Sequence, residues 1–304
     1  MNAASTRVGE LLVVLRDKGV KFRLEEPLAR YTTMGIGGPA EVIAFPASTA
    51  ELVTVTELAS STSVPTRLLG GGSNLLVSDQ GVRGLVIHVG AMKVMGFLPG
   101  AKVEVEAGVS FPALVRAAAA RGLRGLEGGV GIPGSLGGVL AMNAGAYGFA
   151  VGDWVEKVTV VTARGERREL SRSEIDFHYR RTSLGADVAV AGCVLALSED
   201  DPRAIWADLD RNMGHRKATQ PVGVKSAGCI FKNPDGDSAG RLIDSLGLKG
   251  LRVGGAWVSE VHGNFIVQGG GATSADVLAV IDTLKDRVRR ETGVELEEEV
   301  KQWT

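Results

Sequence analysis

The chain has 304 residues, a formal net charge of −1 and a sequence pI of about 6.5. This length can bury a sizeable core over two or three domains, and the near-neutral charge gives no reason to expect nucleic acid or an anionic membrane surface as a partner. Two cysteines do not suggest a disulfide framework, and the N-terminus lacks the apolar core of a signal peptide, so a cytoplasmic protein without membrane insertion is expected.

Two helices of the first half are predicted from the residues that cap them. Ser48 and Glu51 have the spacing of a capping box, which predicts a helix to about Ser60. Ser110 is expected to cap a helix that runs through Arg121. The first 30 residues predict a short amphipathic helix and a connector. Apolar or alternating stretches predict strands at residues 66–69, 85–89, 103–107, 158–162, 169–170, 188–197 and 265–268.

A change in composition at residues 198–202 marks a predicted domain boundary. This segment is polar, and its Asp-Pro end is a good start for a helix that reaches about Arg216. Further helices are predicted over 237–247 and 274–292, the second with apolar residues at helical spacing. Short strands and helices alternate in both halves of the chain, which predicts an α+β fold.

Glycine makes up 42 of the 304 residues, and two glycine-dense loops stand out at residues 69–76 and 128–138. Glycine permits positive φ and close backbone approach, and clustered backbone N–H groups bind anions. These loops, with a third glycine-containing stretch at 32–40, predict one large phosphate-bearing cofactor held from two sides, and hence an enzyme. For any single loop, a structural turn is an equally common explanation. The second loop leads into a predicted short helix near 136–143.

Residues 129–134 match the G-x-G-x-x-G fingerprint of dinucleotide-binding Rossmann folds. That fingerprint should follow a buried strand, but residues 123–128 contain no apolar run of strand length, which disfavours a Rossmann site. Residues 70–74 are not a P-loop, because no Gly-Lys-Ser/Thr follows them. A cofactor held by loops of a non-Rossmann fold is the favoured interpretation.

The side chains that could carry chemistry are scattered along the chain. The four histidines have no ligand spacing with cysteines or carboxylates, so no metal site is predicted, and His88 is expected to be an ordinary packed residue in a strand. Cys229 lies in a polar, loop-like context, which favours function over a role as a buried core side chain. Arg180 and the glutamates near the C-terminus would by themselves be surface charge.

Seven motifs follow one another between about Tyr31 and Trp303: T-x-x-I-G-G-x-A at 33–40, G-G-G-S-N-L-L at 70–76, G-I-P-G-S-x-G-G at 131–138, A-x-N-A-G-A-Y-G at 141–148, Y-R-x-T at 179–182, A-G-C-x-F-K-N-P at 227–234 and L-E-x-E-V at 296–300. In this order they resemble one family, the UDP-N-acetylenolpyruvoylglucosamine reductases of bacterial cell-wall synthesis, also called UDP-N-acetylmuramate dehydrogenases. An ordered set is far more specific than any one of its motifs.

The resemblance implies an α+β fold in which a vanillyl-alcohol-oxidase-type FAD-binding domain precedes a substrate domain. Residues 1–30 would form the N-terminal helix and connector. Residues 31–198 would form the FAD-binding domain, with lobes at about 31–80 and 81–198, and residues 199–304 the substrate-binding domain. FAD is expected to be non-covalent, because Ser73 stands where other flavoproteins of this fold class carry a linking histidine.

The resemblance also implies the reaction. NADPH would reduce UDP-N-acetylglucosamine-enolpyruvate, through FAD, to UDP-N-acetylmuramate for peptidoglycan synthesis, and so for cell shape and division. The protein is expected to act as a monomer in the cytoplasm. The segment between Arg180 and Cys229 is short, as in the subgroup that lacks an extra loop whose tyrosine closes over the substrate.

Three residues match the catalytic positions of the family. Arg180 would stabilise the negative charge that builds on the carboxylate side of the enolpyruvyl group, and Glu299 would help to position and polarise the same centre. Cys229 stands where the family often has serine, and its thiol would donate the proton that completes the reduction. Glu298 occupies a position where proline is usual, which leaves the register between Glu297 and Glu299 open.

The cofactor positions implied by the resemblance are Thr33, Ile36, Gly37, Gly70, Gly71, Gly72, Ser73, Asn74, Leu75, Gly129, Gly131, Ile132, Pro133, Gly134, Ser135, Gly138, Asn143, Gly145 and Ala146. The implied substrate positions are Tyr179, Arg216, Lys217, Asn233 and Asn264. Two other functions stay open: another FAD-dependent oxidoreductase of the same fold that acts on an alcohol or hydroxy acid, and a flavin- or nucleotide-sugar-binding protein without turnover. The intact catalytic set argues against both.

Overall fold

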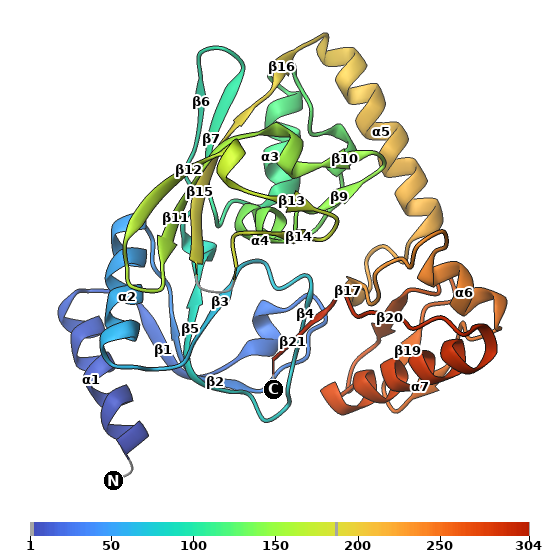
Figure 1. Ribbon diagram of the computed structural model, residues 1–304, viewed down its shortest axis with the longest axis horizontal. Coiled ribbons are helices and arrows are strands. Elements are labelled where there is room, and N and C mark those ends of the chain that lie inside the picture. The colour runs from blue at the N-terminus through green and yellow to red at the C-terminus, as the bar shows by residue number, and fades with distance from the viewer. Residues whose placement is uncertain (1–2, 186–187, 304) are drawn as a thin grey trace. The chain divides into compact units, whose positions relative to one another are not determined.

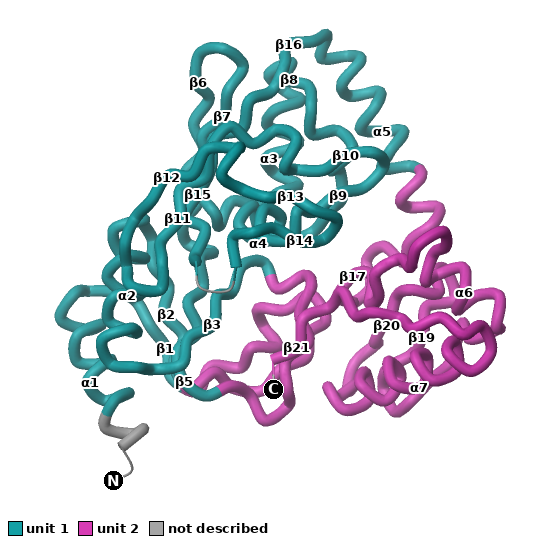
Figure 2. The backbone as a smooth tube through the Cα atoms, in the orientation of Figure 1, with its two compact units in different colours: residues 1–24, 42–71, 83–214 teal, residues 25–41, 72–82, 215–304 magenta. Residues whose placement is uncertain are grey.

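The computed structural model describes residues 3–185 and 188–303, with only the backbone of residues 3–6. Backbone contacts divide the chain into two compact units (Figure 2). Unit 1 comprises the described residues up to Leu24, Val42–Gly71 and Arg83–Gly214; unit 2 comprises Glu25–Glu41, Gly72–Val82 and the described residues from His215 onward. The predicted boundaries after residues 30, 80 and 198 concern ligand-binding domains and stay predictions.

A five-stranded antiparallel sheet with the order β12-β11-β15-β7-β6 forms the centre of unit 1 (Figure 1). The central strand β15 is buried along nearly its whole length, as its run of valine and alanine requires. Helix α4 packs against β15 and β7, and α2 against β11. The strands of this sheet are β6 (Met95–Leu98), β7 (Lys102–Glu106), β11 (Val155–Thr162), β12 (Arg167–Ser171) and β15 (Val188–Ala196).

A four-stranded sheet with the order β1-β2-β5-β3 accompanies it, and three short strand pairs, β8–β16, β9–β10 and β13–β14, complete the strands of unit 1. Strands β1, β2 and β5 each continue along the chain into unit 2. The bounds of these strands are β1 (Phe22–Pro27), β2 (Pro39–Ala44), β3 (Thr66–Leu69), β5 (Val82–His88), β8 (Leu123–Arg124), β9 (Gly145–Ala146), β10 (Phe149–Ala150), β13 (Phe177–His178), β14 (Arg181–Thr182) and β16 (Ser198–Glu199).

The helices of unit 1 show which predicted caps form. Ser48 caps α2 by accepting a 3.2 Å hydrogen bond from the Glu51 N–H, whereas the Glu51 carboxylate accepts from Ala47, one residue before the cap. Ser110 is the N-cap residue of α3, as predicted, but its hydroxyl makes no cap bond, and its backbone forms a bridge with Ser135. The helices are α1 (Ala3–Asp17), α2 (Thr49–Ser61), α3 (Phe111–Ala119), α4 (Leu136–Ala141) and α5 (Pro202–Thr219), which runs on into unit 2.

Unit 2 is a smaller layer of helices on an antiparallel sheet with the order β17-β20-β19-β18. Helix α7 packs on β18 and β19, and its residues Val277, Ile281 and Leu284 are fully buried, as their helical spacing predicts. A parallel pair, β4–β21, brings the C-terminal strand beside residues that follow the first glycine loop. The elements are β4 (Leu75–Val77), β17 (Lys225–Cys229), α6 (Ala239–Ser245), β18 (Arg252–Val253), β19 (Ala256–Val258), β20 (Phe265–Gln268), α7 (Ser274–Thr292) and β21 (Lys301–Trp303).

Gly72 provides a test of how the first glycine loop is fixed in unit 2. Its φ is +59°, and a Cβ atom there would lie 1.9 Å from the Tyr31 carbonyl oxygen. We expect Gly72→Ala to lower the free energy of unfolding by more than about 2 kcal/mol, because the backbone must move. Gly293, with φ +75° and open space around it, is the control, and Gly293→Ala should cost only about 1 kcal/mol. Equal losses in urea denaturation would contradict this account.

Candidate functional site

The two glycine loops meet in unit 1. A Cβ atom on Gly71 would lie 2.5 Å from the Gly134 Cα, and one on Gly70 would lie 2.5 Å from the Ser135 Oγ. Real Cβ atoms do not approach other heavy atoms this closely, so only glycine permits this packing of one loop against the other. The structure therefore brings together the two loops that the sequence predicts to hold one cofactor.

The second loop is anchored by the segment that links β7 to α3. The Phe111 N–H donates to the Gly134 carbonyl (3.0 Å), and the Leu136 N–H donates to the Val109 carbonyl (2.9 Å). An isolated bridge between Ser110 and Ser135 lies between these bonds. This support was missed in the sequence, because Ser110 matched a helix cap and the pairing is long-range.

Ser135 supplies the observation that tests whether these loops fit a phosphate-bearing cofactor. The residue is 5% exposed, and its Oγ has no hydrogen-bond partner among the described residues. A buried hydroxyl without a partner costs free energy unless a ligand or water satisfies it. The neighbouring glycines have no side chains that shield their backbone N–H groups. The Ser135 hydroxyl and these N–H groups can donate hydrogen bonds to an anionic oxygen. The residues therefore fit the pyrophosphate of FAD.

His88 lies beside the first loop, where the sequence analysis expected only ordinary packing. Its strand pairs with β3 so that His88 is opposite Leu69, and its ring makes an edge contact with Phe45 at 5.6 Å. Burial lowers the pKa of His88, while a hydrogen bond with the Gly70 backbone opposes that shift. A histidine with a lowered pKa therefore lies beside Gly70, at the start of the first glycine loop. The position of His88 near the end of a predicted strand could have suggested that it lies near the loop. Its bond with the Gly70 backbone could not be predicted from the sequence.

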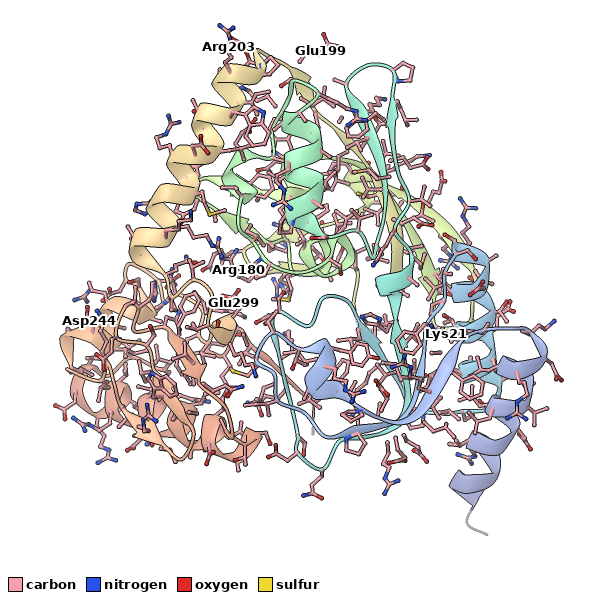
Figure 3. The ribbon with its side chains drawn as sticks, turned by 180° about the vertical axis from the view of Figure 1, so that it is seen from behind. Lys21, Arg180, Glu199, Arg203, Asp244 and Glu299 are labelled. Atoms are coloured by element: carbon pink, nitrogen blue, oxygen red, sulfur yellow. The ribbon has the colours of Figure 1, made fainter. Side chains whose placement is uncertain are left out.

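Arg180 lies on a tight turn of unit 1. The β13–β14 hairpin pairs His178 with Arg181, so that Tyr179 and Arg180 form the turn between them. Figure 3 labels the Arg180 side chain. Arg180 has φ +56°, a conformation that bulky residues rarely adopt, and its guanidinium lies 5.0 Å from the centre of the Tyr179 ring. Tyr179 itself is 57% exposed. Backbone strain of this kind is concentrated at functional sites.

Cys229 and Glu299 come together in unit 2. Cys229 ends β17, and the Glu299 N–H donates a 2.8 Å hydrogen bond to the carbonyl of Ile230, the next residue. The Glu299 carbonyl accepts from the Asn74 side chain at 3.0 Å. Glu299 is therefore bonded to Ile230 through its N–H and to the Asn74 side chain, at the end of the first glycine loop, through its carbonyl.

The two neighbouring glutamates, Glu297 and Glu298, make ion pairs. Glu297 pairs with Lys232 at the surface. Glu298 pairs with Lys285 of α7 at 2.9 Å. The backbones of all three glutamates adjoin the segment after Cys229: the Glu297 carbonyl accepts from the Lys232 N–H at 2.8 Å, Glu298 forms a bridge with Phe231, and the Glu299 N–H donates to the Ile230 carbonyl.

The third glycine-containing stretch also lies in unit 2. The Thr33 N–H donates to the Gly72 carbonyl (3.0 Å), and the Thr33 Oγ1 donates to the Ser226 carbonyl (2.7 Å). Gly37 has φ +143°, and a Cβ there would lie 3.0 Å from the Val77 Cβ. This stretch therefore links the first loop to strand β17.

The predicted substrate positions have different surroundings. Asn264 is 2% exposed, and its amide bonds both backbone groups of Phe231, at 2.9 and 2.8 Å. Asn233 is exposed, and its Oδ1 accepts from the Ala239 N–H. Arg216 and Lys217 lie in the last turn of α5, where cations also favour the helix dipole.

Gly145 and Ala146 form β9, whose hairpin to β10 turns at residues 147–148. Asn143 precedes them, and its amide is bonded to protein groups within unit 1. Across residues 3–185 and 188–303, no group of three or more His, Cys, Asp or Glu side chains could hold a metal ion. Within the same part of the chain, no helix has the length and apolar character needed to cross a membrane.

Comparisons with known proteins identify the family. A model of the UDP-N-acetylenolpyruvoylglucosamine reductase C-terminal domain matches residues 220–303, and a model of an FAD-binding domain matches residues 39–171. The reductase 2 of Symbiobacterium thermophilum is 45% identical over 95% of this chain and 94% of its own length, and the reductase of Desulfosudis oleivorans is 44% identical over 95% and 96%. The crystal structure of the Thermus caldophilus reductase matches with a TM-score of 0.81 and 41% identity, over 94% of this chain and 99% of that one.

Ser135→Ala tests the loop pair as a cofactor site. We expect it to weaken FAD binding about five- to tenfold, because one neutral hydrogen bond contributes about 1 kcal/mol. Ser110→Ala is the matched control, since it removes an exposed hydroxyl from the residue whose backbone pairs with Ser135. Flavin fluorescence titration measures both. FAD dissociation constants that are the same in the two variants would contradict the assignment.

Proposed function

The chain belongs to the UDP-N-acetylenolpyruvoylglucosamine reductase family, and we propose that Arg180, Cys229 and Glu299 are its catalytic residues. The enzyme uses FAD and NADPH to reduce UDP-N-acetylglucosamine-enolpyruvate to UDP-N-acetylmuramate, a precursor of peptidoglycan. The observation that carries the assignment of Cys229 and Glu299 to one site is the backbone bond that joins Glu299 to the residue after Cys229, and Arg180 is assigned from the Y-R-x-T motif that contains it.

The glycine loops are the proposed holder of FAD. Gly70, Gly71, Gly134 and Ser135 would surround its pyrophosphate with bare backbone and one buried hydroxyl. When bound, FAD supplies the hydride that originates from NADPH. The protein contributes the groups that bind the substrate and move charge and protons around it.

Arg180 is proposed to stabilise the negative charge that develops on the substrate. Addition of hydride to the terminal carbon of the enolpyruvyl double bond moves an electron pair toward the carbon that bears the carboxylate, and an enolate develops. A fixed guanidinium beside that carboxylate stabilises the transition state, most strongly where water is excluded. The left-handed turn at Arg180 supports this role, because strain is retained where it places a functional group.

Cys229 is proposed to donate the proton that completes the reduction. Its S–H bond breaks as a C–H bond forms at the carboxylate-bearing carbon, and the thiolate then regains a proton from solvent. A thiol, with an ordinary pKa of about 8.5, is a far stronger acid than the serine hydroxyl that the family often has. Glu299, fixed beside this strand, would help to position and polarise the same centre.

The substrate-binding assignments are proposed from the positions and hydrogen bonds of the side chains. Arg216 and Lys217 are proposed to contact the diphosphate of the substrate, and Tyr179 and Asn233 are exposed and able to reach a ligand. The Asn264 amide bonds both backbone groups of Phe231. These bonds support a role in which Asn264 positions the segment after Cys229 instead of contacting the substrate. We also propose that the protein acts as a monomer in the cytoplasm.

Substitution of Cys229 tests the proposed proton transfer. In anaerobic stopped-flow experiments, we expect Cys229→Ala to leave reduction by NADPH unchanged. Reoxidation of the flavin by the enolpyruvyl substrate should slow by about 10²–10⁴-fold, the usual contribution of a general acid. Cys229→Ser should retain part of the activity, because a hydroxyl can still donate.

Cys193→Ala is the control for this experiment. Cys193 is 3% exposed in β15, and its burial raises the pKa of its thiol, so it should be inert in the reaction. A Cys229→Ala enzyme that reoxidises at the rate of Cys193→Ala would remove Cys229 from the mechanism.

A further inference from the structure

Asn143 joins the end of α4 to the hairpin that carries Arg180. It is 8% exposed with φ +41°, a left-handed conformation in which asparagine is enriched. Its Nδ2 donates to the His178 carbonyl at 3.0 Å, and its Oδ1 accepts from the Gly152 N–H at 3.1 Å. One buried amide thus holds His178, two residues before Arg180, against a separate segment of unit 1.

The other side of the hairpin is supported in the same way. The Thr182 Oγ1 donates to the Ala141 carbonyl at 3.1 Å, so residues on both sides of the turn are bonded to the end of α4. Arg172 donates to the Gly152 carbonyl at 2.8 Å, and its guanidinium lies 4.5 Å from the centre of the Phe177 ring. Strand β13 is therefore fixed at a backbone carbonyl and at a side-chain ring.

The turn at Arg180 requires hydrogen bonds such as these, because its backbone conformation is strained. A bulky side chain with φ +56° is unfavourable on its own and persists only where the surroundings determine it. Helix α4 begins at Leu136, directly after Ser135 of the second glycine loop. The bonds of Asn143 therefore set the Arg180 turn relative to a helix that starts at the cofactor loop.

We propose that Asn143 is a positioning residue for Arg180. The sequence placed it among the cofactor contacts, whereas its amide is directed to His178 and Gly152. Loss of the His178 bond shifts the turn and misplaces the guanidinium, while the glycine loops that bind FAD keep their packing. The inference rests on the proposed catalytic role of Arg180.

Asn143→Asp tests this positioning role with the smallest change. The variant keeps an oxygen acceptor for the Gly152 N–H but replaces the donor to His178 with a second oxygen. We expect flavin reoxidation by the enolpyruvyl substrate to slow by about tenfold to a hundredfold, because a displacement of about 1 Å can cost that much. The FAD dissociation constant and the rate of flavin reduction by NADPH should stay within about twofold of the wild type.

Asn212→Asp is the matched control. Asn212 also donates its Nδ2 to a backbone carbonyl in unit 1, that of Glu127 at 3.2 Å, so the chemical change is the same at a place remote in sequence from the hairpin. This variant should reoxidise like the wild type. Asn143→Gly is the second variant, since glycine adopts positive φ without strain and removes both bonds; it should show the same selective loss and decides the question if Asn143→Asp does not fold.

Two outcomes would overturn the positioning role: wild-type reoxidation in both Asn143 variants, or a parallel loss of FAD affinity and of both half-reactions, which would make Asn143 a cofactor contact. Arg180→Lys in the same assay separates this from failure of the proposed function. If Arg180→Lys reoxidises normally, the catalytic role of Arg180 fails. If Arg180→Lys is slow, Asn143→Asp should add little in that background, because Asn143 acts through Arg180.

Discussion

The close backbone packing of the first glycine loop is the constraint on which the rest of the structure depends. Gly70 and Gly71 leave no room for a side chain against Ser135 and Gly134 of the second loop. Gly72, the next residue, leaves none against the Tyr31 carbonyl. Gly70 and Gly71 thus pack against the second glycine loop in unit 1, whereas Gly72 packs within unit 2, and at each of the three positions a Cβ atom would come too close to another heavy atom.

Hydrogen bonds to the backbone, made by asparagine side chains as well as by other backbone groups, connect the end of this loop to the segments of the proposed catalytic residues Cys229 and Glu299. Asn74, at the end of the same loop, bonds the Glu299 carbonyl, and the Glu299 N–H bonds Ile230. Asn264 fixes Phe231 from the other side through two bonds to its backbone. Asn74, the segment after Cys229 and Glu299 are thereby joined by hydrogen bonds within unit 2. Proton transfer needs this accuracy, because a donor must lie within hydrogen-bond reach of its target.

Local sequence predicted much of the secondary structure, and long-range contacts account for what it missed. Strands β3 and β20 and helix α7 have the predicted bounds, because their patterns and flanking residues act over short distances. Residues 25–41 and 72–82 belong to unit 2 through bonds such as that of the Gln268 amide to the Met34 carbonyl at 2.8 Å, which no local pattern reveals. The motif order predicted Arg180, Cys229 and Glu299 as catalytic residues, whereas the ion pairs of Glu297 with Lys232 and of Glu298 with Lys285 depend on the tertiary fold and could not be predicted.

An anaerobic rapid-mixing experiment on the wild-type protein with bound FAD tests both half-reactions of the proposed enzyme. NADPH is added first and the flavin absorbance followed, and UDP-N-acetylglucosamine-enolpyruvate is added second. We expect NADPH to bleach the flavin and the enolpyruvyl substrate to restore the oxidised spectrum. A flavin that bleaches but stays reduced after the second addition would contradict the assigned reaction.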